Sequence, residues 1–486
     1  MITSPDLLAG ETEYMPELLK ELIDFTPLIT IICCLFVLSF IFFKKYNKKR
    51  FNSVFILFLF IGLILIFSVS ISLFLKIGGG NLFGKGCLDV NAIGKLSVLI
   101  LLDFKKDSRE KIKNNTDKKA NGKRNIQHPL FGISTRKWIK LVEKNGGIDK
   151  IYLNRGIFIT IFSICTAPFR LIFKIKYSSK IKDTEIKNPP VFIIGHWRSG
   201  TTYMHELLCE DPQFCYITLW QTMLPDSFLI LEPMKKFLSN FLPKERPMDQ
   251  IKVDIDGPYE EEAALATLNL WSFFHVLHFP KNAEEQYQKS INFEDLTNEE
   301  RTEWKNNYLN FMKSIAFTNK GKRLLLKDPA NTARIPFLLE LFPDAKFIHI
   351  YRNPYNVYLS TVKMRNRVLN KLALQEGNKD EMERNVIKNY KELMTSFFKQ
   401  KNLIPKENFV EIRYEDLIKD PLKEIKKIYM KLKLNGIERA LPGMNKYLIS
   451  RKDYKTNVYN INEKVIERVN KNWEFTIKRW RYKPPE

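Results

Sequence analysis

From about residue 186 onward the chain alternates short apolar runs with segments of helical periodicity. Runs rich in branched side chains occupy residues 191–195, 323–327, 346–351 and 409–414. A helical pattern covers residues 332–342, and Asn353-Pro354 supplies a helix cap and a first-turn proline for the next helix. Buried strands that alternate with helices predict an α/β domain with a central parallel sheet covered on both faces. Binding sites in such domains lie at the carboxyl ends of the strands.

The N-terminal part has a different pattern, with two long apolar runs at residues 27–43 and 54–75. A membrane span needs about 20 apolar residues, so the two runs predict a transmembrane hairpin over residues 27–75. The loop 44–50 between them carries five positive charges, whereas the tail 1–26 is acidic. By the positive-inside rule the loop is cytoplasmic. The tail and the large domain would then lie on the other side, in the Golgi or secretory lumen.

Residues 76–185 form a juxtamembrane region in this interpretation. Its segment 105–124 is basic, has no apolar periodicity and contains the sequon Asn114-Asn115-Thr116, which fits a flexible linker in a lumen. A third apolar stretch, residues 156–174, contains Pro168 and Arg170. These two residues favour an interfacial or buried helix over a third span. A third span would move the large domain to the cytoplasm.

The composition adds a strong positive charge to this picture. The 78 lysines and arginines give a net charge of +24, which favours anionic partners such as phosphates, sulfates, acidic glycans, nucleic acid or anionic lipid. A lysine-rich solvated surface is the alternative explanation for most of these residues. The six cysteines form neither a disulfide framework nor a metal-ligand pattern, so we expect no structural metal.

The stretch "VFIIGHWRSGTT" reads as a strand, a tight loop and a helix start. Gly195 and Gly200 enclose four residues, as in a phosphate-binding loop, but Thr201-Thr202 follow where that loop has its lysine. Backbone amides, the helix start and the threonine hydroxyls can bind an anion, and Arg198 can reach it. The pattern predicts a P-loop-like three-layer sandwich. A plain strand-to-helix turn is the alternative.

The strand "KFIHIY" ends in Arg352, and Ser360 follows eight residues later. A magnesium-dependent phosphoryl-transfer enzyme would carry an aspartate at such a strand end. Arginine and serine instead suit a second phosphate group. The loop without lysine and the strand without aspartate therefore argue against a nucleotide kinase or ATPase.

Three motifs together resemble the PAPS-dependent sulfotransferases, closest to the membrane-associated and bacterial-type branch. They are "GHWRSGTTYMHELLCEDP", "LLLKDPANTARIPFLLELFPDAKFIHIYRNPYNVYLSTVK" and "RYEDLIKDP", and the resemblance covers residues 186–486. It implies the donor 3′-phosphoadenosine 5′-phosphosulfate (PAPS) and no metal. The donor's 5′-phosphosulfate would lie against Arg198, Ser199, Gly200, Thr201 and Thr202. Its 3′-phosphate would be held by Arg352 and Ser360.

The resemblance also assigns Lys327 to the transferring sulfonate, where it would offset charge on the leaving phosphate. "KDP" is the form of the tyrosylprotein branch, so a peptide acceptor stays open. The histidine base of the cytosolic enzymes is absent, because Pro329 occupies its place. Glu260, Glu261 and Glu262 are the candidate bases, and an acidic first helical turn is the alternative explanation for them. His275 and His278 are weaker candidates.

Near the C-terminus, "RKDYKTNVYNI" resembles a segment that lies beside the nucleotide, which makes Tyr454 and Lys455 candidate donor contacts. We expect a membrane-anchored, multi-pass sulfotransferase that acts on a hydroxyl of a carbohydrate, lipid or peptide, with no nucleic-acid partner. The competing hypothesis is a non-catalytic anion-binding membrane protein of the same fold. The sequence leaves the acceptor and the oligomeric state open.

Overall fold

The computed structural model describes residues 128–484, except 241, 243–252, 294, 453–458 and 460. The acidic tail, the two apolar runs, the basic loop and the linker 105–124 lie outside the described residues. Within the described part of the chain, no helix alone has the length and apolar character of a membrane span. One consecutive pair, Lys150–Cys165 and Ala167–Lys182, reaches that length and composition together but bends by 40° at its break.

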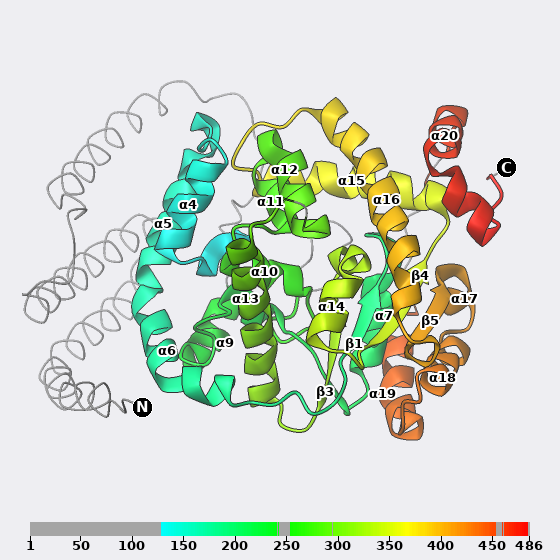
Figure 1. Cartoon of the computed structure of the whole chain (residues 1–486), viewed down its shortest axis with the longest axis horizontal. Helices are drawn as coiled ribbons and strands as arrows, with labels where there is room; N and C mark the ends of the chain where they lie inside the picture. The colour runs from blue at the N-terminus through cyan, green and yellow to red at the C-terminus, as the bar shows by residue number, and fades with distance from the viewer. Residues whose placement is uncertain are drawn as a thin grey trace, which may run out of the picture. The chain divides into compact units, whose positions relative to one another are not determined.

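Five parallel strands form the central sheet, in the order β2-β3-β1-β4-β5 (Figure 1). Their bounds are β1 Val191–Ile194, β2 Phe214–Cys215, β3 Arg323–Lys327, β4 Lys346–Tyr351 and β5 Phe409–Arg413. The parallel sheet confirms the prediction made from the apolar runs. The sequence pattern missed β2, because a strand of two residues gives no periodic signal.

Alternate side chains of the strands enter two separate cores, which explains why the strands are apolar at every position. Val191 and Ile193 pack with one set of helices, and Phe192 and Ile194 pack with the other. On the Val191 face lie α7 Thr201–Cys209, α17 Tyr414–Lys419, α18 Pro421–Lys431 and α19 Ile437–Ser450. On the Phe192 face lie α13 Asn298–Thr318, α14 Ile335–Leu341, α15 Pro354–Leu372, α16 Lys379–Gln400 and α20 Glu463–Trp480.

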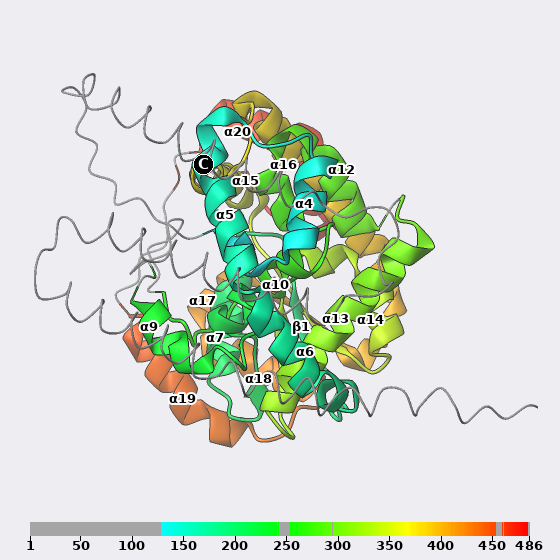
Figure 2. The ribbon, with the colours of Figure 1, turned by 90° about the vertical axis from the view of Figure 1, so that its left-hand side faces the viewer.

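The remaining helices extend the domain beyond these two layers. They are α4 Thr135–Lys144, α5 Leu153–Cys165, α6 Ala167–Lys182, α8 Leu219–Met223, α9 Lys235–Ser239, α10 Glu261–Leu268, α11 Phe273–His278 and α12 Ala283–Tyr287. Figure 2 shows α5 and α6 on the side of the domain that faces the viewer, where α6 packs beside α13.

Two predicted helices differ from the structure. The pattern at residues 332–342 is a 3₁₀ turn, Pro329–Ala333, followed by α14, because the Asp328 carboxylate caps the amide of Ala330 and starts a separate turn. The stretch 156–174 is two helices that meet at Thr166. Pro168 lies in the first turn of α6, where it cannot donate a backbone hydrogen bond to α5. The predicted cap at Asn353 is confirmed, since its side chain accepts from the amide of Tyr355 at 3.0 Å.

Candidate functional site

The phosphate-type loop after β1 needs glycine at both of its ends. Gly195 has φ 142° and Gly200 has φ 104°, a region that L-residues rarely adopt. A Cβ atom at Gly195 would overlap the carbonyl oxygen of Ile350, and one at Gly200 would overlap the ring of Tyr414. The loop is therefore pressed against the ends of β4 and β5, which fixes the direction of its amides.

Two backbone amides of this loop form hydrogen bonds that fix its conformation before α7. The Gly195 amide donates to Thr332 Oγ1 at 2.8 Å, and the Ser199 amide donates to the carbonyl of His196 at 3.1 Å. The Ser199 hydroxyl is buried and has no hydrogen-bond partner among the described residues. Because buried hydroxyls are normally paired, Ser199 fits a site whose ligand supplies the partner.

Two arginines meet at this loop. Arg198 Nε donates to Ser360 Oγ at 2.9 Å, and the Tyr459 hydroxyl donates to the same oxygen at 3.0 Å. Arg352 Nη1 donates to the backbone carbonyl of Arg198 at 3.3 Å, and its guanidinium lies 4.4 Å from the centre of the Tyr414 ring. The structure thus brings Arg198, Arg352 and Ser360 together at the carboxyl ends of β1 and β4.

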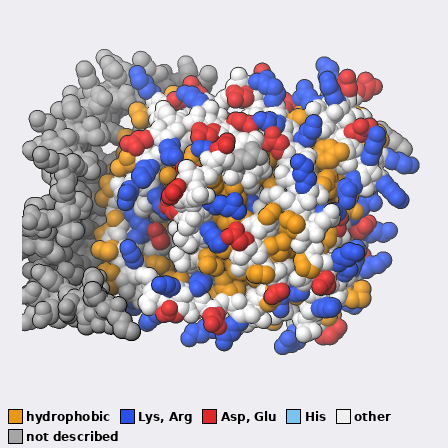
Figure 3. All heavy atoms as spheres, in the orientation of Figure 1, with side chains coloured by type: hydrophobic (Ala, Val, Ile, Leu, Met, Phe, Trp, Pro, Cys, Tyr) orange, Lys and Arg blue, Asp and Glu red, His pale blue; other side chains and the backbone are white. Residues whose placement is uncertain are grey.

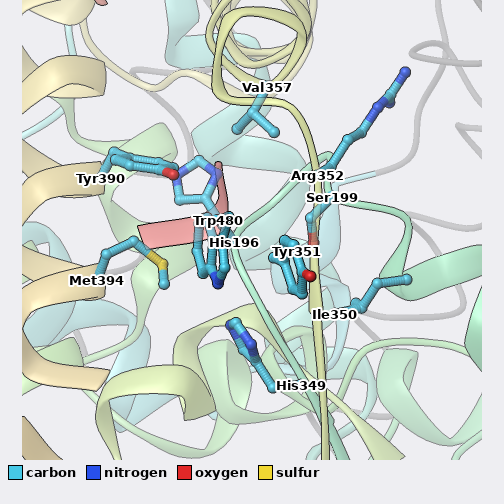
Figure 4. Close-up of a pocket in the computed structure, with 10 residues that line it drawn as sticks. All are labelled: His196, Ser199, His349, Ile350, Tyr351, Arg352, Val357, Tyr390, Met394 and Trp480. Carbon is cyan, nitrogen blue, oxygen red and sulfur yellow. The ribbon is translucent and has the colours of Figure 1, made fainter. Parts of the chain in front are cut away.

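A small cavity lies between the loop and the end of β4 (Figure 4). Its lining is largely aromatic, and the ring of Tyr351 stacks on Trp480 with centroids 4.6 Å apart. His349 stacks on Phe397 at 3.9 Å. Figure 4 shows Arg352 extending away from this wall of rings. Packing behind the strand therefore fixes the point from which Arg352 projects.

Lys327 and Glu260 form an ion pair beside the same loop. Lys327 Nζ lies 2.6 Å from Glu260 Oε1 and 3.5 Å from Thr202 Oγ1. The lysine side chain is 3% exposed and the glutamate side chain 20% exposed, so the carboxylate still reaches solvent. Lys327 ends β3, and Glu260 is the N-cap residue of α10. A lysine and a partly exposed carboxylate thus lie together next to the anion loop.

The other two glutamates of the triplet point into the core. Glu262 Oε2 accepts from Arg334 Nη1, and its other oxygen accepts from Ser272 Oγ, both at 2.7 Å. Burial alone would raise the pKa of Glu262, but the charge of Arg334 lowers it below the usual value. Glu261 accepts from Tyr308 and Asn331, and burial raises its pKa to about 7. These bonds leave Glu260 as the member of the triplet that faces Lys327.

The weaker histidine candidates are core residues. His275 Nδ1 lies 3.2 Å from His278 Nδ1, and both side chains are fully buried. Burial lowers the pKa of His275 to about 4, which keeps its ring neutral. We therefore assign both histidines to the packed core of the domain.

The sequence did not identify several residues that support the site, and two of the residues that it did indicate lie outside the described part of the chain. Thr332 accepts a hydrogen bond from the Gly195 amide of the anion loop, and Tyr459 donates one to Ser360, which also binds Arg198. No motif spacing in the sequence indicated either contact. Tyr414 stands at a predicted strand end, and only its packing on Gly200 reveals its role. Tyr454 and Lys455 lie outside the described residues.

Taken together, the fold and site define a transferase for an anionic donor: a strand-to-helix anion loop, two arginines and a paired lysine and carboxylate at the ends of a parallel sheet. Residues 189–438 match the model of the sulfotransferase family. The chain belongs to this family and is a sulfotransferase.

Two curated relatives are similar over most of the chain. Omega-hydroxy-beta-dihydromenaquinone-9 sulfotransferase Stf3 from Mycobacterium bovis and the protein of that name from Mycobacterium tuberculosis are each 32% identical over 356 residues. The match covers 73% of this chain and 91% of each relative.

Two solved structures share the fold. Sulfotransferase STF1 from Mycobacterium tuberculosis has a TM-score of 0.51 and 18% identity, and covers 71% of this chain and 93% of its own. Sulfotransferase STF9 from Mycobacterium avium has a TM-score of 0.53 and 16% identity, and covers 72% of this chain and 96% of its own.

Proposed function

We propose that this sulfotransferase transfers the sulfonate of PAPS to a hydroxyl group of a membrane lipid. The observation that carries the proposal is the pair of Lys327 and Glu260 beside the anion loop. A lysine and a partly exposed carboxylate within 2.6 Å of each other provide the charge and the base that sulfonate transfer to an alcohol requires.

The anion loop fits the 5′-phosphosulfate end of the donor. Its backbone amides, the unpartnered Ser199 hydroxyl and the Thr201 and Thr202 hydroxyls are the donors for this group. Arg352 and Ser360 would hold the 3′-phosphate, with Arg198 between the two ends of the ligand. Arginine suits this position because its planar guanidinium can bind two oxygens at once.

The transfer step assigns one role to each member of the ion pair. The acceptor oxygen forms a bond to sulfur while the bond from sulfur to the 5′-phosphate oxygen breaks. Glu260 takes the acceptor's proton, and Lys327 stabilises the negative charge that develops on the leaving phosphate. The products are a sulfate ester and adenosine 3′,5′-bisphosphate. Protonation neutralises Glu260 and so weakens its ion pair with Lys327. The ammonium group is then available to stabilise the leaving phosphate.

The lipid acceptor class rests on two observations. The name of the relative Stf3 states that its acceptor is a hydroxylated menaquinone, an apolar lipid. The apolar runs 27–43 and 54–75 fit a chain anchored in a membrane with two spans. We extend the proposal to a multi-pass protein whose residues 186–486 form the catalytic domain in the lumen. Carbohydrate and peptide hydroxyls are the competing acceptors.

Transfer of ³⁵S from labelled PAPS to three acceptor pools tests the proposal. Lipid extract, glycans and peptides are each incubated with the full chain and with Lys327→Ala. We expect lipid products that the variant does not form. Adenosine 3′,5′-bisphosphate should raise the melting temperature without magnesium, and ATP should not. Sulfated glycans or peptides without sulfated lipid would overturn the acceptor class, and no transfer in any pool would overturn the activity.

A further inference from the structure

The outer side of α5 and α6 carries a stripe of apolar side chains. The outer stripe comprises Leu153, Ile157, Ile161, Ile164, Leu171, Ile172 and Ile175, all of them exposed or half-exposed. Leu171 is 59% exposed and Ile175 is 64% exposed. Figure 3 shows orange side chains beside blue ones along the edge of the domain where α5 and α6 lie. Isolated exposed apolar residues are common, but seven at helical spacing form a continuous surface.

Helix α6 buries a different apolar side in the domain. Phe173 and Ile181 are buried, and Phe169 and Tyr177 pack partly against them. Because each residue of a helix advances by about 100°, Ile175 lies about 200° around the helix from Phe173. The helix is thus apolar on two opposite sides, of which the fold covers one. A helix that is apolar on both sides normally has a second apolar neighbour.

The charged residues within α5 and α6 are all positive. Lys174 and Lys176 flank Ile175 on either side of the helix, and both are exposed. Residues 150–182 contain seven lysines and arginines and no aspartate or glutamate. An apolar stripe flanked by lysines complements an anionic lipid surface, where the headgroups pair with the cations and the acyl chains take the apolar side chains. The chain's own runs 27–43 and 54–75 carry no charge and would leave the lysines without a partner.

The buried side of α6 connects this surface to the site. Phe173 packs in one cluster with Trp220 of α8 and Ile255. The amide of Trp220 donates to the carbonyl of Ile255 at 2.9 Å, and the amide of Tyr259 donates to the carbonyl of Ile217 at 2.8 Å. The segment from Ile255 to Tyr259 leads directly to Glu260. The buried side of α6 and the segment that leads to Glu260 therefore belong to one packed cluster.

We propose that the outer stripe docks α5 and α6 in the interface of an anionic lipid bilayer and so holds the Glu260 loop beside the membrane. The docking rests on the stripe and its lysines alone, whereas delivery of a lipid acceptor also rests on the proposed function. The bend at Thr166 lets two short helices follow the surface instead of crossing it.

A local probe tests the docking in the full chain, whose other apolar runs would bind vesicles in any case. An environment-sensitive fluorescent amino acid replaces Ile175 in the protein reconstituted into vesicles of phosphatidylcholine and phosphatidylglycerol. The matched control carries the probe at Met430 of α18, which is 78% exposed and lies outside the stripe. We expect blue-shifted emission and quenching by nitroxide-labelled acyl chains at position 175, and neither at position 430. Lys174→Gln with Lys176→Gln should shift the probe toward the undocked state by about fivefold per lysine.

Two results would overturn the docking. Emission at position 175 that is blue-shifted but insensitive to the lipid nitroxide would show that protein, either residues 27–75 or a second copy, covers the stripe. Water-like emission would show an open surface. Sulfonate transfer to a short-chain, water-soluble alcohol is measured on the same preparations. Turnover without quenching would contradict the docking proposal alone. Quenching without transfer to any acceptor would contradict the proposed function alone.

Discussion

Lys327 Nζ lies 2.6 Å from Glu260 Oε1, so the lysine and the carboxylate that we propose as the base form one ion pair. The pair joins the end of β3 to the start of α10, two elements 67 residues apart in the chain. Thr202 Oγ1 lies 3.5 Å from the same lysine nitrogen, so the pair adjoins the start of α7. The geometry therefore distinguishes Glu260, which faces Lys327, from Glu261 and Glu262, which are buried in the core.

Glu260→Gln should lower turnover by a factor of about 100 or more, because general-base catalysis contributes about 10²–10⁴ in rate. Donor affinity should stay near that of the native protein, since Glu260 contacts Lys327 and not the anion loop. Rates come from transfer of ³⁵S, and donor affinity comes from calorimetry.

Glu262→Gln is the matched control for this variant. It leaves the buried guanidinium of Arg334 without its carboxylate, so the free energy of unfolding should fall by about 3–5 kcal/mol. The folded fraction should still turn over. A Glu260→Gln protein with a near-native rate would place the base elsewhere.

Arg352→Ala and Arg198→Ala should differ in the ligands that they weaken. A charge-assisted bond to phosphate contributes about 1.5–3 kcal/mol, so Arg352→Ala should weaken adenosine 3′,5′-bisphosphate about 10- to 150-fold. It should barely affect adenosine 5′-phosphosulfate, which has no 3′-phosphate. Arg198→Ala should weaken both, because Arg198 belongs to the anion loop and also binds Ser360. Equal losses for both ligands in a folded Arg352→Ala protein would show that the 3′-phosphate binds elsewhere.

Gly200→Ala should abolish donor binding and lower the melting temperature. Its φ of 104° strains an alanine by about 1–2 kcal/mol, and the added Cβ would also overlap the ring of Tyr414. Gly321→Ala is the control, because Gly321 has φ 78° with no atom within 4 Å of the added Cβ. The control should show the backbone strain alone and retain donor binding. Thermal shift with and without adenosine 3′,5′-bisphosphate measures both effects.

Acid should destabilise the folded domain below about pH 6. The six histidines of the chain are all buried, and burial lowers the pKa of each, to about 4 for His128 and His275 and to about 3 for His196 and His205. Below pH ~6.5 the unfolded chain binds protons at these rings that the folded chain does not, so stability rises with pH in this window.

Three buried carboxyl groups act in the opposite direction. Burial raises the pKa of Glu261 to about 7 and that of Asp226 to about 6, and it raises the pKa of Asp328 well above its usual value. Their stabilising effect is present at low pH and is lost as pH rises. Because the shifted histidines outnumber these carboxyl groups, we expect the free energy of unfolding to fall as the pH drops from about 6 toward 4.5. Urea unfolding in detergent at several pH values measures this slope, and a flat profile would contradict the neutral histidines.

Protease treatment of sealed vesicles tests the membrane orientation. If the loop 44–50 is cytoplasmic, residues 186–486 should resist protease until detergent is added. Replacing its five lysines and arginines by glutamine should make part of the protein accessible, because the positive charges set the orientation. Digestion of the native domain in intact vesicles would reverse the proposed topology.

The sequence predicted the strand ends and the anion loop but not the contacts between them. Periodicity and glycine spacing are local, so they identified β1, β3, β4 and β5 and the loop at Gly195. The choice among Glu260, Glu261 and Glu262 depends on Arg334, Asn331 and Lys327, which become neighbours only when the sheet assembles. The bond from Tyr459 to Ser360 depends in the same way on tertiary packing.

Tyr414, which follows β5, packs against Gly200 in the loop after β1 and against Arg352, which follows β4. The anion site therefore depends on the assembled sheet. Its parts come from segments between residues 195 and 459, so the site forms only when these segments fold together. A ligand that binds only the folded state stabilises it, by about 2.7 kcal/mol at 100 times its dissociation constant. Since cells degrade chains that unfold, we expect the amount of this protein to rise and fall with the supply of its own donor.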